Sequence, residues 1–265
     1  MWPAGAFTGT LGTLAPEANF GSDSPKAALL GDPQFPQVIL KRNPADRAAL
    51  LQKLFETYSA MNLTVAADKS VAISGLERRL ANNLDGITAY GVMECYLHRS
   101  LLWQRAAEKP LRRIKYPKKR SIPSWSWMAY DGAIEYLKVP NQGVEWNNCI
   151  FFPPARGSVA TTAPAKSQSS VRELSVSVSV LCAAEIQREP WRLSIDNPGA
   201  VDFEELASVV VVGRSRTSIG SLPGDVELYV LVVKETFMGG YQRVGAGRIQ
   251  ERHLAAKGTM VGRII

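Results

Sequence analysis

Histidine and cysteine are scarce in this chain, which has two histidines and three cysteines in 265 residues. Histidine is the side chain that ordinarily titrates near neutrality, so general-base catalysis would depend on His98 or His253. Neither stands in a recognisable nucleophile motif. Cys95, Cys149 and Cys182 are odd in number and far apart, which excludes a disulfide framework and a zinc-ligand spacing. We therefore expect no catalytic residue, no metal site, no cofactor and a reducing compartment.

Long apolar runs are also absent from the sequence. No stretch approaches the roughly 20 apolar residues that a membrane-spanning helix needs. No Lys or Arg precedes Lys26, and the same stretch has no apolar run of the length of a secretory signal. These absences predict a soluble intracellular protein without a membrane partner, and they favour the cytoplasm.

Glycine motifs that bind phosphate are a third absence. The segments Gly213–Gly220 and Gly239–Gly247 contain several glycines, but neither matches G-x-G-x-x-G or a Walker loop that opens a helix. We interpret the glycines of the second segment as turns and as close approaches between neighbouring strands.

The first part of the chain is predicted to be helical after an irregular lead-in. Residues 1–42 are rich in Gly, Pro, Ala and Ser without a sustained period, which is typical of an irregular or disordered segment. Helical spacing of apolar residues then predicts about three helices, near 43–61, 68–83 and 88–105, the first of them capped by an Asn-Pro pair.

The second part of the chain is predicted to be rich in strands. From Ser121 the apolar period changes from 3.6 to 2, so the helical region, 43–152, should end in a short tryptophan-rich strand. Residues 153–171 are poor in large apolar groups and are predicted to form a linker or long loop. In residues 172–265, the alternating run Leu174–Val180 and several β-branched runs predict a mostly antiparallel sheet or partial barrel. The expected fold class is therefore α+β.

The most distinctive segment is Pro123-Ser124-Trp125-Ser126-Trp127. In a strand, residues i and i+2 point to the same side, so the pattern predicts two indoles on one face. Large aromatic side chains at alternating positions usually supply buried area. We therefore favour a packing role, at a junction between the helical and the β-rich parts, over a ligand platform.

A basic segment comes directly before the tryptophans. Nine Lys or Arg residues and one acid, Glu108, occur between Arg99 and Arg120, an excess larger than the net charge of +7 of the whole chain. These cations could neutralise phosphates, and Tyr116 could stack on a base. The alternative, a solvated loop, is the one that we favour. Lys118-Lys119-Arg120 could also be read by nuclear import machinery. The candidate residues for binding a polyanion or a partner are Arg112, Arg113, Lys115, Lys118, Lys119 and Arg120.

Several short motifs follow one another in a set order: Tyr58-Ser59, Leu63-Thr64, Asp68-Lys69, Ala72-Ile73-Ser74-Gly75, Leu101-Leu102-Trp103, and Pro123 to Trp127 followed by Asp131-Gly132. This order and spacing resembles the region that follows the HET domain in fungal heterokaryon-incompatibility proteins. The segment Val230–Val233 with Gly240–Ile249 looks like the closing part of those proteins. The motif residues, which we interpret as structural, are Tyr58, Ser59, Asp68, Lys69, Ser74, Gly75, Trp103, Pro123, Ser124, Trp125, Ser126, Trp127 and Gly132.

The resemblance implies a role in nonself recognition and programmed cell death in filamentous fungi. It ties that activity mainly to the HET domain, whose Tyr-Ser-Tyr-x-Trp-Gly type motif we expect upstream of this sequence. We therefore expect a non-catalytic accessory region that acts through an unknown protein partner, or a truncated and inactive copy. Two alternatives stay open: a basic nucleic-acid-binding module that uses residues 99–120, and an enzyme with an unrecognised site.

Overall fold

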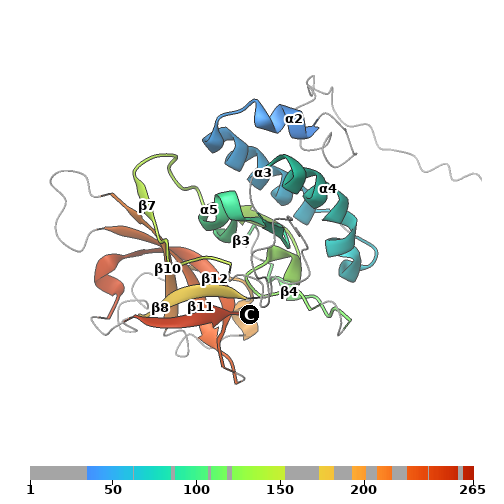
Figure 1. The fold of residues 1–265 in the computed structure, drawn as a ribbon. Helices are drawn as coiled ribbons and strands as arrows, with labels where there is room; N and C mark the ends of the chain where they lie inside the picture. Colours follow the sequence, from blue (N-terminus) through green and yellow to red (C-terminus); the bar gives the residue numbers. More distant parts are fainter. Residues whose placement is uncertain are drawn as a thin grey trace, which may run out of the picture.

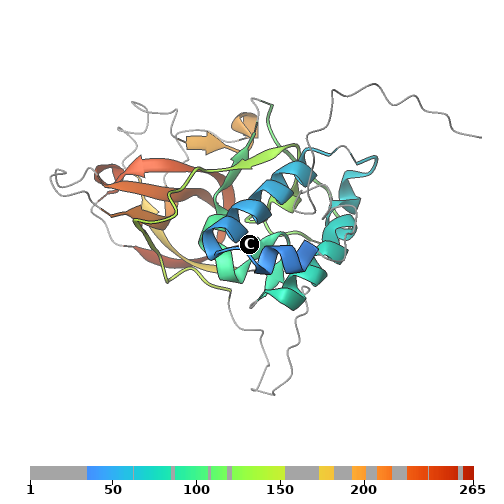
Figure 2. The same ribbon diagram turned by 90° about the horizontal axis from the view of Figure 1, so that it is seen from above.

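The computed structural model describes residues 35–61, 63–84, 87–106, 109–117, 121–152, 173–181, 193–200, 208–216, 226–237, 239–255 and 259–265. The α+β class predicted from the sequence is confirmed, because helices precede a β-rich part built on a seven-stranded mixed sheet. The longer helices gather on one side of the molecule and the large sheet lies on the other (Figures 1 and 2). No helix in the described ranges is long and apolar enough to cross a membrane.

Two of the predicted helices are present. Helix α3 (Pro44–Ser59) begins where expected, because the Asn43 side chain accepts a hydrogen bond from the Asp46 N–H at 3.0 Å and Pro44 occupies the first turn. Helix α4 (Lys69–Asn83) follows a 3-10 turn, η1 (Ala66–Asp68).

A short helix, α2 (Phe35–Leu40), lies inside the segment that was predicted to be irregular. That prediction is wrong for these six residues, because α2 packs against α3 and α4 and buries Ile39 to 1% exposure. Tertiary burial of this kind outweighs a weak local period. The other residues of the lead-in that precede Phe35, and the predicted linker 153–171, lie outside the described residues.

The predicted helix over residues 88–105 is wrong. This segment instead forms β1 (Thr88–Ala89), β2 (Val92–Met93), the 3-10 turn η2 (Glu94–Tyr96), a short helix α5 (Leu97–Leu101) and β3 (Trp103–Arg105). Gly91 makes the turn between β1 and β2 with a φ of +76°, and its N–H donates to the Glu77 carboxylate of α4. The apolar residues do keep helical spacing, but Met93 packs with the helices whereas Leu97 packs with the sheet.

Two small ladders join the helical part to the large sheet. Strand β3 pairs with β6 (Ile134–Tyr136), and β4 (Arg112–Arg113) pairs with β5 (Tyr130–Asp131). Strand β6 packs on α3, whereas β3 packs beside strands of the large sheet. The region 43–152 is therefore only partly helical.

Five strands of the large sheet close on themselves. They are β8 (Leu174–Val180), β10 (Ser208–Ser215), β11 (Glu227–Glu235), β12 (Tyr241–Gln250) and β13 (Met260–Ile264). Neighbours in this order pair antiparallel as far as β12, and β13 then pairs antiparallel with β8 and parallel with β12 at one position. The alternating run at β8 is confirmed as a strand, and the pairing supports the barrel alternative.

Four shorter elements complete the β-rich part. Strand β7 (Val144–Trp146) pairs with β10, and β9 (Leu193–Ile195) pairs with β12. The 3-10 turns are η6 (Pro198–Ala200) and η8 (Glu251–His253). The interpretation of the β12 glycines is confirmed: Gly239 and Gly240 have φ of +79° and +89°, and a Cβ on Gly245 would lie 2.5 Å from the Ser194 oxygen of β9.

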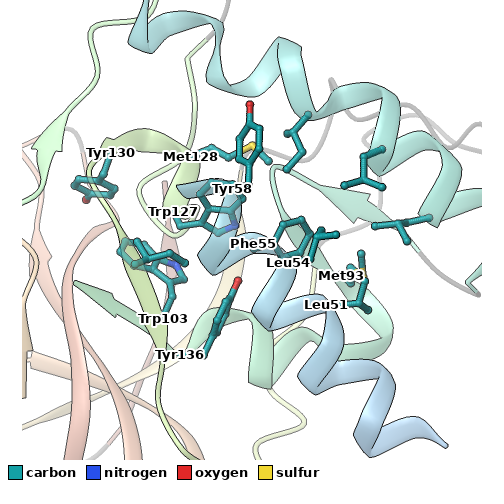
Figure 3. Packing of buried hydrophobic residues seen from close by; sticks show 14 of the residues in the cluster. Leu51, Leu54, Phe55, Tyr58, Met93, Trp103, Trp127, Met128, Tyr130 and Tyr136 are labelled. Atoms are coloured by element: carbon teal, nitrogen blue, oxygen red, sulfur yellow. The ribbon is translucent and has the colours of Figure 1, made fainter. Parts of the chain in front are cut away.

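Apolar side chains form three neighbouring clusters. The first lies among the helices and contains Phe55 and Trp127 (Figure 3). The second lies between α5 and the barrel and contains Trp125 and Val210. The third is formed by the opposite side chains of the same strands, such as Val209. Because Tyr90 packs against both of the first two clusters, the helices and the barrel share a continuous apolar core.

Candidate functional site

The two tryptophans of the distinctive motif do not form a strand. Residues 124–126 make a turn, and a 3-10 helix, η4 (Trp127–Ala129), follows directly. The prediction of a tryptophan-rich strand with both indoles on one face is therefore wrong. The Ser126 side chain accepts a hydrogen bond from the Met128 N–H and so caps η4, which breaks the alternation on which that prediction depended.

The two indoles point into different halves of the core. Trp127 packs against Phe55 and Tyr58, with ring centroids 5.5 and 6.0 Å away, among the helices (Figure 3). Trp125 packs against Tyr90 and Phe152, at 6.0 and 5.5 Å, beside the barrel. Both are fully buried. The segment is therefore a junction between the helical part and the barrel.

The serines of the motif hold the junction through backbone groups. The Ser124 hydroxyl donates to the backbone oxygen of Ile265 and accepts from the Arg243 N–H at 3.0 Å. The Ser126 hydroxyl donates to the backbone oxygen of Tyr90 at 2.6 Å. Since these partners are distant in sequence, each serine satisfies buried polar groups that only the folded chain brings together.

A buried ion pair that the sequence analysis missed lies at the centre of the junction. The Arg243 Nε is 3.3 Å from the Asp196 carboxylate, and both side chains are at most 2% exposed. The Arg243 guanidinium also stacks on the Trp103 ring, 3.2 Å from its centroid, and donates to the backbone oxygens of Leu101 and Trp103. One sequence signal existed: Arg243 shares a side of β12 with Tyr241, where an apolar residue would be expected.

Motif residues of the helical part reach the same junction. The Lys69 ammonium donates to the backbone oxygen of Tyr130 at 2.9 Å, and the Tyr58 hydroxyl donates to the backbone oxygen of Lys69 at 2.8 Å. Burial lowers the pKa of Lys69 to about 8, and the nearby Asp131 carboxylate opposes this only in part. Lys69 and Tyr58 belong to the quoted motifs, but nothing in the sequence around them predicts their burial.

The outer edge of β6 is closed by side chains of α3. The Ser59 hydroxyl accepts from the Ile134 N–H at 2.9 Å, and the Glu56 carboxylate accepts from the Tyr136 N–H at 3.0 Å. These bonds satisfy backbone donors that would otherwise be open to another strand. The sequence does not indicate this role of Glu56, because a carboxylate on a helix surface carries no signal that it will accept a hydrogen bond from a distant strand.

Four motif residues lie away from this buried network or at its margin. Asp68 and Gly75 are exposed, and Ser74 is half-buried with its hydroxyl bonded to the Val71 oxygen of the same helix. Gly132 adopts a φ of +124° at the turn after β5, where a Cβ would lie 2.7 Å from Leu111.

The basic segment is partly exposed and partly engaged. Arg112, Arg113 and Lys115 are exposed, whereas Lys118, Lys119 and Arg120 lie outside the described residues. The Tyr116 hydroxyl donates to the Met128 oxygen at 2.8 Å and the ring packs on the helical core. The ring that the polyanion alternative would use to stack on a base is therefore half-buried against the helical core.

A pocket of about 340 Å³ opens where the basic segment meets the barrel, and we call it the junction pocket. Arg113 and Ser121–Pro123 line one side of it. The other side comes from Glu173 before β8, Thr236 and Gln242 on the two arms of the β11–β12 hairpin, and Ile265. The end marked C in Figure 1 accordingly lies near β4.

The two histidines are engaged in structural contacts. The His98 ring stacks on Trp146 at 5.4 Å and its Nε2 bonds the Asn147 oxygen at 2.8 Å, and burial lowers its pKa. The His253 Nδ1 accepts from the Gln250 N–H at 3.2 Å. Cys95, three residues before His98, is exposed. Within the described ranges, no group of three or more His, Cys, Asp or Glu side chains is placed to hold a metal ion.

Comparison with family models, with curated proteins and with solved structures finds no match to this chain. The resemblance to heterokaryon-incompatibility proteins therefore depends on the quoted motifs alone.

Proposed function

We propose that this chain is a non-catalytic accessory region of the heterokaryon-incompatibility type, which contributes to nonself recognition and cell death by binding a protein partner. One observation carries the proposal. Most motif side chains are buried between the helical part and the barrel, where Ser124, Ser126 and Lys69 bond backbone oxygens across the junction. Residues used in this way fix the arrangement of two parts of a fold, and they leave partner contacts to the exposed surface.

The environment of the nucleophile and base candidates supports a non-catalytic role. The Ser124 and Ser126 hydroxyls donate to backbone oxygens, and His98 is stacked and bonded to a backbone oxygen. A nucleophile needs a base within hydrogen-bond reach, and that base needs a group that orients it. These hydroxyl and imidazole groups bond backbone oxygens and so stabilise the fold.

The form of the basic segment favours a protein partner over nucleic acid. Binding of a single strand without sequence preference combines cations with aromatic rings that stack on bases. The Tyr116 ring is packed and its hydroxyl is bonded, so the described part of the segment offers cations without that platform. Arg is also frequent at the centres of protein–protein interfaces.

Expression in a filamentous fungus tests the proposal. The chain should be produced alone and as a fusion that follows a HET domain, with an unrelated barrel of similar size in the control fusion. We expect hyphae with the chain alone to stay viable, and the fused chain to change the killing rate of the HET domain relative to the control fusion. Killing by the chain alone, or identical killing by the two fusions, would contradict an accessory role.

A further inference from the structure

We propose that the junction pocket binds an acidic peptide segment of a protein partner. A carboxylate of the peptide would bond Arg113, and a neighbouring apolar side chain would pack against Ile122, Pro123 and Ile265. This inference rests on the proposed function, and it adds the chemistry of the partner and the place where it binds.

Arg113 is a cation whose partners are all neutral. In the described structure its guanidinium bonds the Tyr130 hydroxyl at 3.5 Å and the Ile122 oxygen at 3.4 Å, and it lies 5.6 Å from the Tyr130 ring centroid. A guanidinium has five N–H donors in a planar fork that matches a carboxylate. The long bonds to neutral oxygens hold the fork in place and leave donors for an acid.

The acid already present in the pocket does not neutralise Arg113. The Glu173 carboxylate pairs with Arg263 at 2.8 Å, so its charge is compensated on the barrel side. Of the two charged side chains that line the pocket, Arg113 is therefore the one without a partner of opposite charge in the described structure. Charge complementarity therefore selects an anionic ligand.

The walls of the pocket select a peptide among anionic ligands. Ile122 and Pro123 are buried beneath its surface, Ile265 is 38% exposed, and the Ser121 hydroxyl and Gln242 amide add polar groups. Phe237, next to Thr236 in the hairpin, is fully exposed. An Arg beside apolar and aromatic groups in a concave surface is the composition of an interface centre.

A second pocket, along β6, has paired charges in its wall. The pocket of about 490 Å³ along β6 contains Arg248 and Glu227, which lie 3.8 Å apart, and Gln104, which bonds Glu135 at 2.7 Å. An incoming charged group would have to displace these partners. Arg113 of the junction pocket, unlike Arg248, bonds only neutral oxygens in the described structure.

Two arginines on one strand provide a matched test. Successive side chains of β4 point to opposite faces, so Arg112→Gln removes the same charge as Arg113→Gln but away from the pocket. The probe is an array of eight-residue peptides with one Glu and one Leu at varied spacing, each paired with a copy that has Gln in place of Glu. The peptides that bind the wild-type chain are then measured by fluorescence polarisation.

We expect Arg113→Gln to weaken binding roughly 10- to 100-fold, as for a lost charge-assisted hydrogen bond, and Arg112→Gln to change it less than about 3-fold. The peptide with Gln should lose a similar amount and should not discriminate between the wild-type chain and Arg113→Gln. Ser121→Asp, which places a carboxylate beside Arg113, should also weaken binding. Urea unfolding of each variant confirms that it is folded.

Three outcomes would overturn the inference: no peptide that prefers Glu to Gln, equal losses for the two arginine variants, or tighter binding of a single-stranded oligonucleotide than of any peptide. The proposed function is judged separately. If the Arg113→Gln fusion alters HET-domain killing as the wild-type fusion does, the accessory role stands and the pocket is not its binding site.

Discussion

Lys69 makes the stability of this protein depend on pH in a direction opposite to that of most lysines. The residue is 2% exposed, and its ammonium lies 5.5 Å from the Trp127 ring centroid and donates a hydrogen bond to the backbone oxygen of Tyr130. Burial lowers its pKa to about 8 from 10.5. Between these two pH values the unfolded chain binds more protons than the folded chain, so the free energy of unfolding rises with pH across that window.

The magnitude follows from the size of the shift. One pKa unit corresponds to about 1.36 kcal/mol, so the full change is about 3 kcal/mol. Below pH 8 the lysine is protonated in both states and its contribution is constant. The assay is urea unfolding of wild type and Lys69→Met at several pH values from 7 to 10.5. We expect wild type to gain up to about 3 kcal/mol relative to the variant as the pH rises from 8 to 10.5.

The difference between the two proteins cancels the titration of the buried tyrosines, which both share. Lys115→Met, which removes an exposed lysine, is the control for the loss of one positively charged side chain. A difference between wild type and Lys69→Met that does not change with pH would refute the argument, because it would mean that the ammonium is solvated in the folded state.

The remaining predictions concern the buried ion pair and two glycines. Asp196→Ala leaves the Arg243 charge buried without its partner, so the free energy of unfolding in urea should fall by about 3 to 5 kcal/mol; adding Arg243→Met should recover part of that loss. Gly75→Ala should raise the free energy of unfolding by about 1 kcal/mol, and with it the melting temperature, because Ala has a higher helix propensity than Gly and a Cβ there meets nothing within 4 Å. Gly91→Ala should lower it, since its Cβ would lie 2.3 Å from the Trp127 Nε1 at a φ of +76°. A stabilising Ala at 91, or an unchanged stability of Asp196→Ala, would contradict these expectations.

Local signals explain the parts of the fold that the sequence predicts. Helix α3 has its cap, its first-turn proline and its apolar stripe within one contiguous segment, and β8 alternates without interruption. The prediction for residues 88–105 was wrong because the structure of this segment depends on distant residues. The Glu77 carboxylate accepts a hydrogen bond from the Gly91 N–H, and the Trp127 ring covers that glycine. The same apolar spacing fits one helix that packs on one core, and it also fits two short segments that pack on different cores before and after a turn. The spacing alone therefore could not distinguish these two structures.

The candidate site was less predictable than the fold. The sequence identified the basic segment, but the junction pocket also needs Glu173, Thr236, Gln242 and Ile265, which only the barrel brings beside Arg113. The Arg243–Asp196 pair joins residues 47 positions apart. Burial of a charge depends on partners of this kind, and a single sequence does not specify who they are.

The motif residues form two groups, one buried at the junction and one exposed on the surface. This division limits the ways in which the resemblance can be interpreted. Trp103, Trp125, Ser124 and Lys69 are accounted for by folding, because each fills or bonds the junction. Gly75 is not, since it lies exposed in the middle of α4 and costs helix stability without relieving any clash. A resemblance that included only the first group would indicate a shared fold. The presence of Gly75 in the same motif means that the surface of α4, as well as the junction, has to be explained by any account of what this chain contacts.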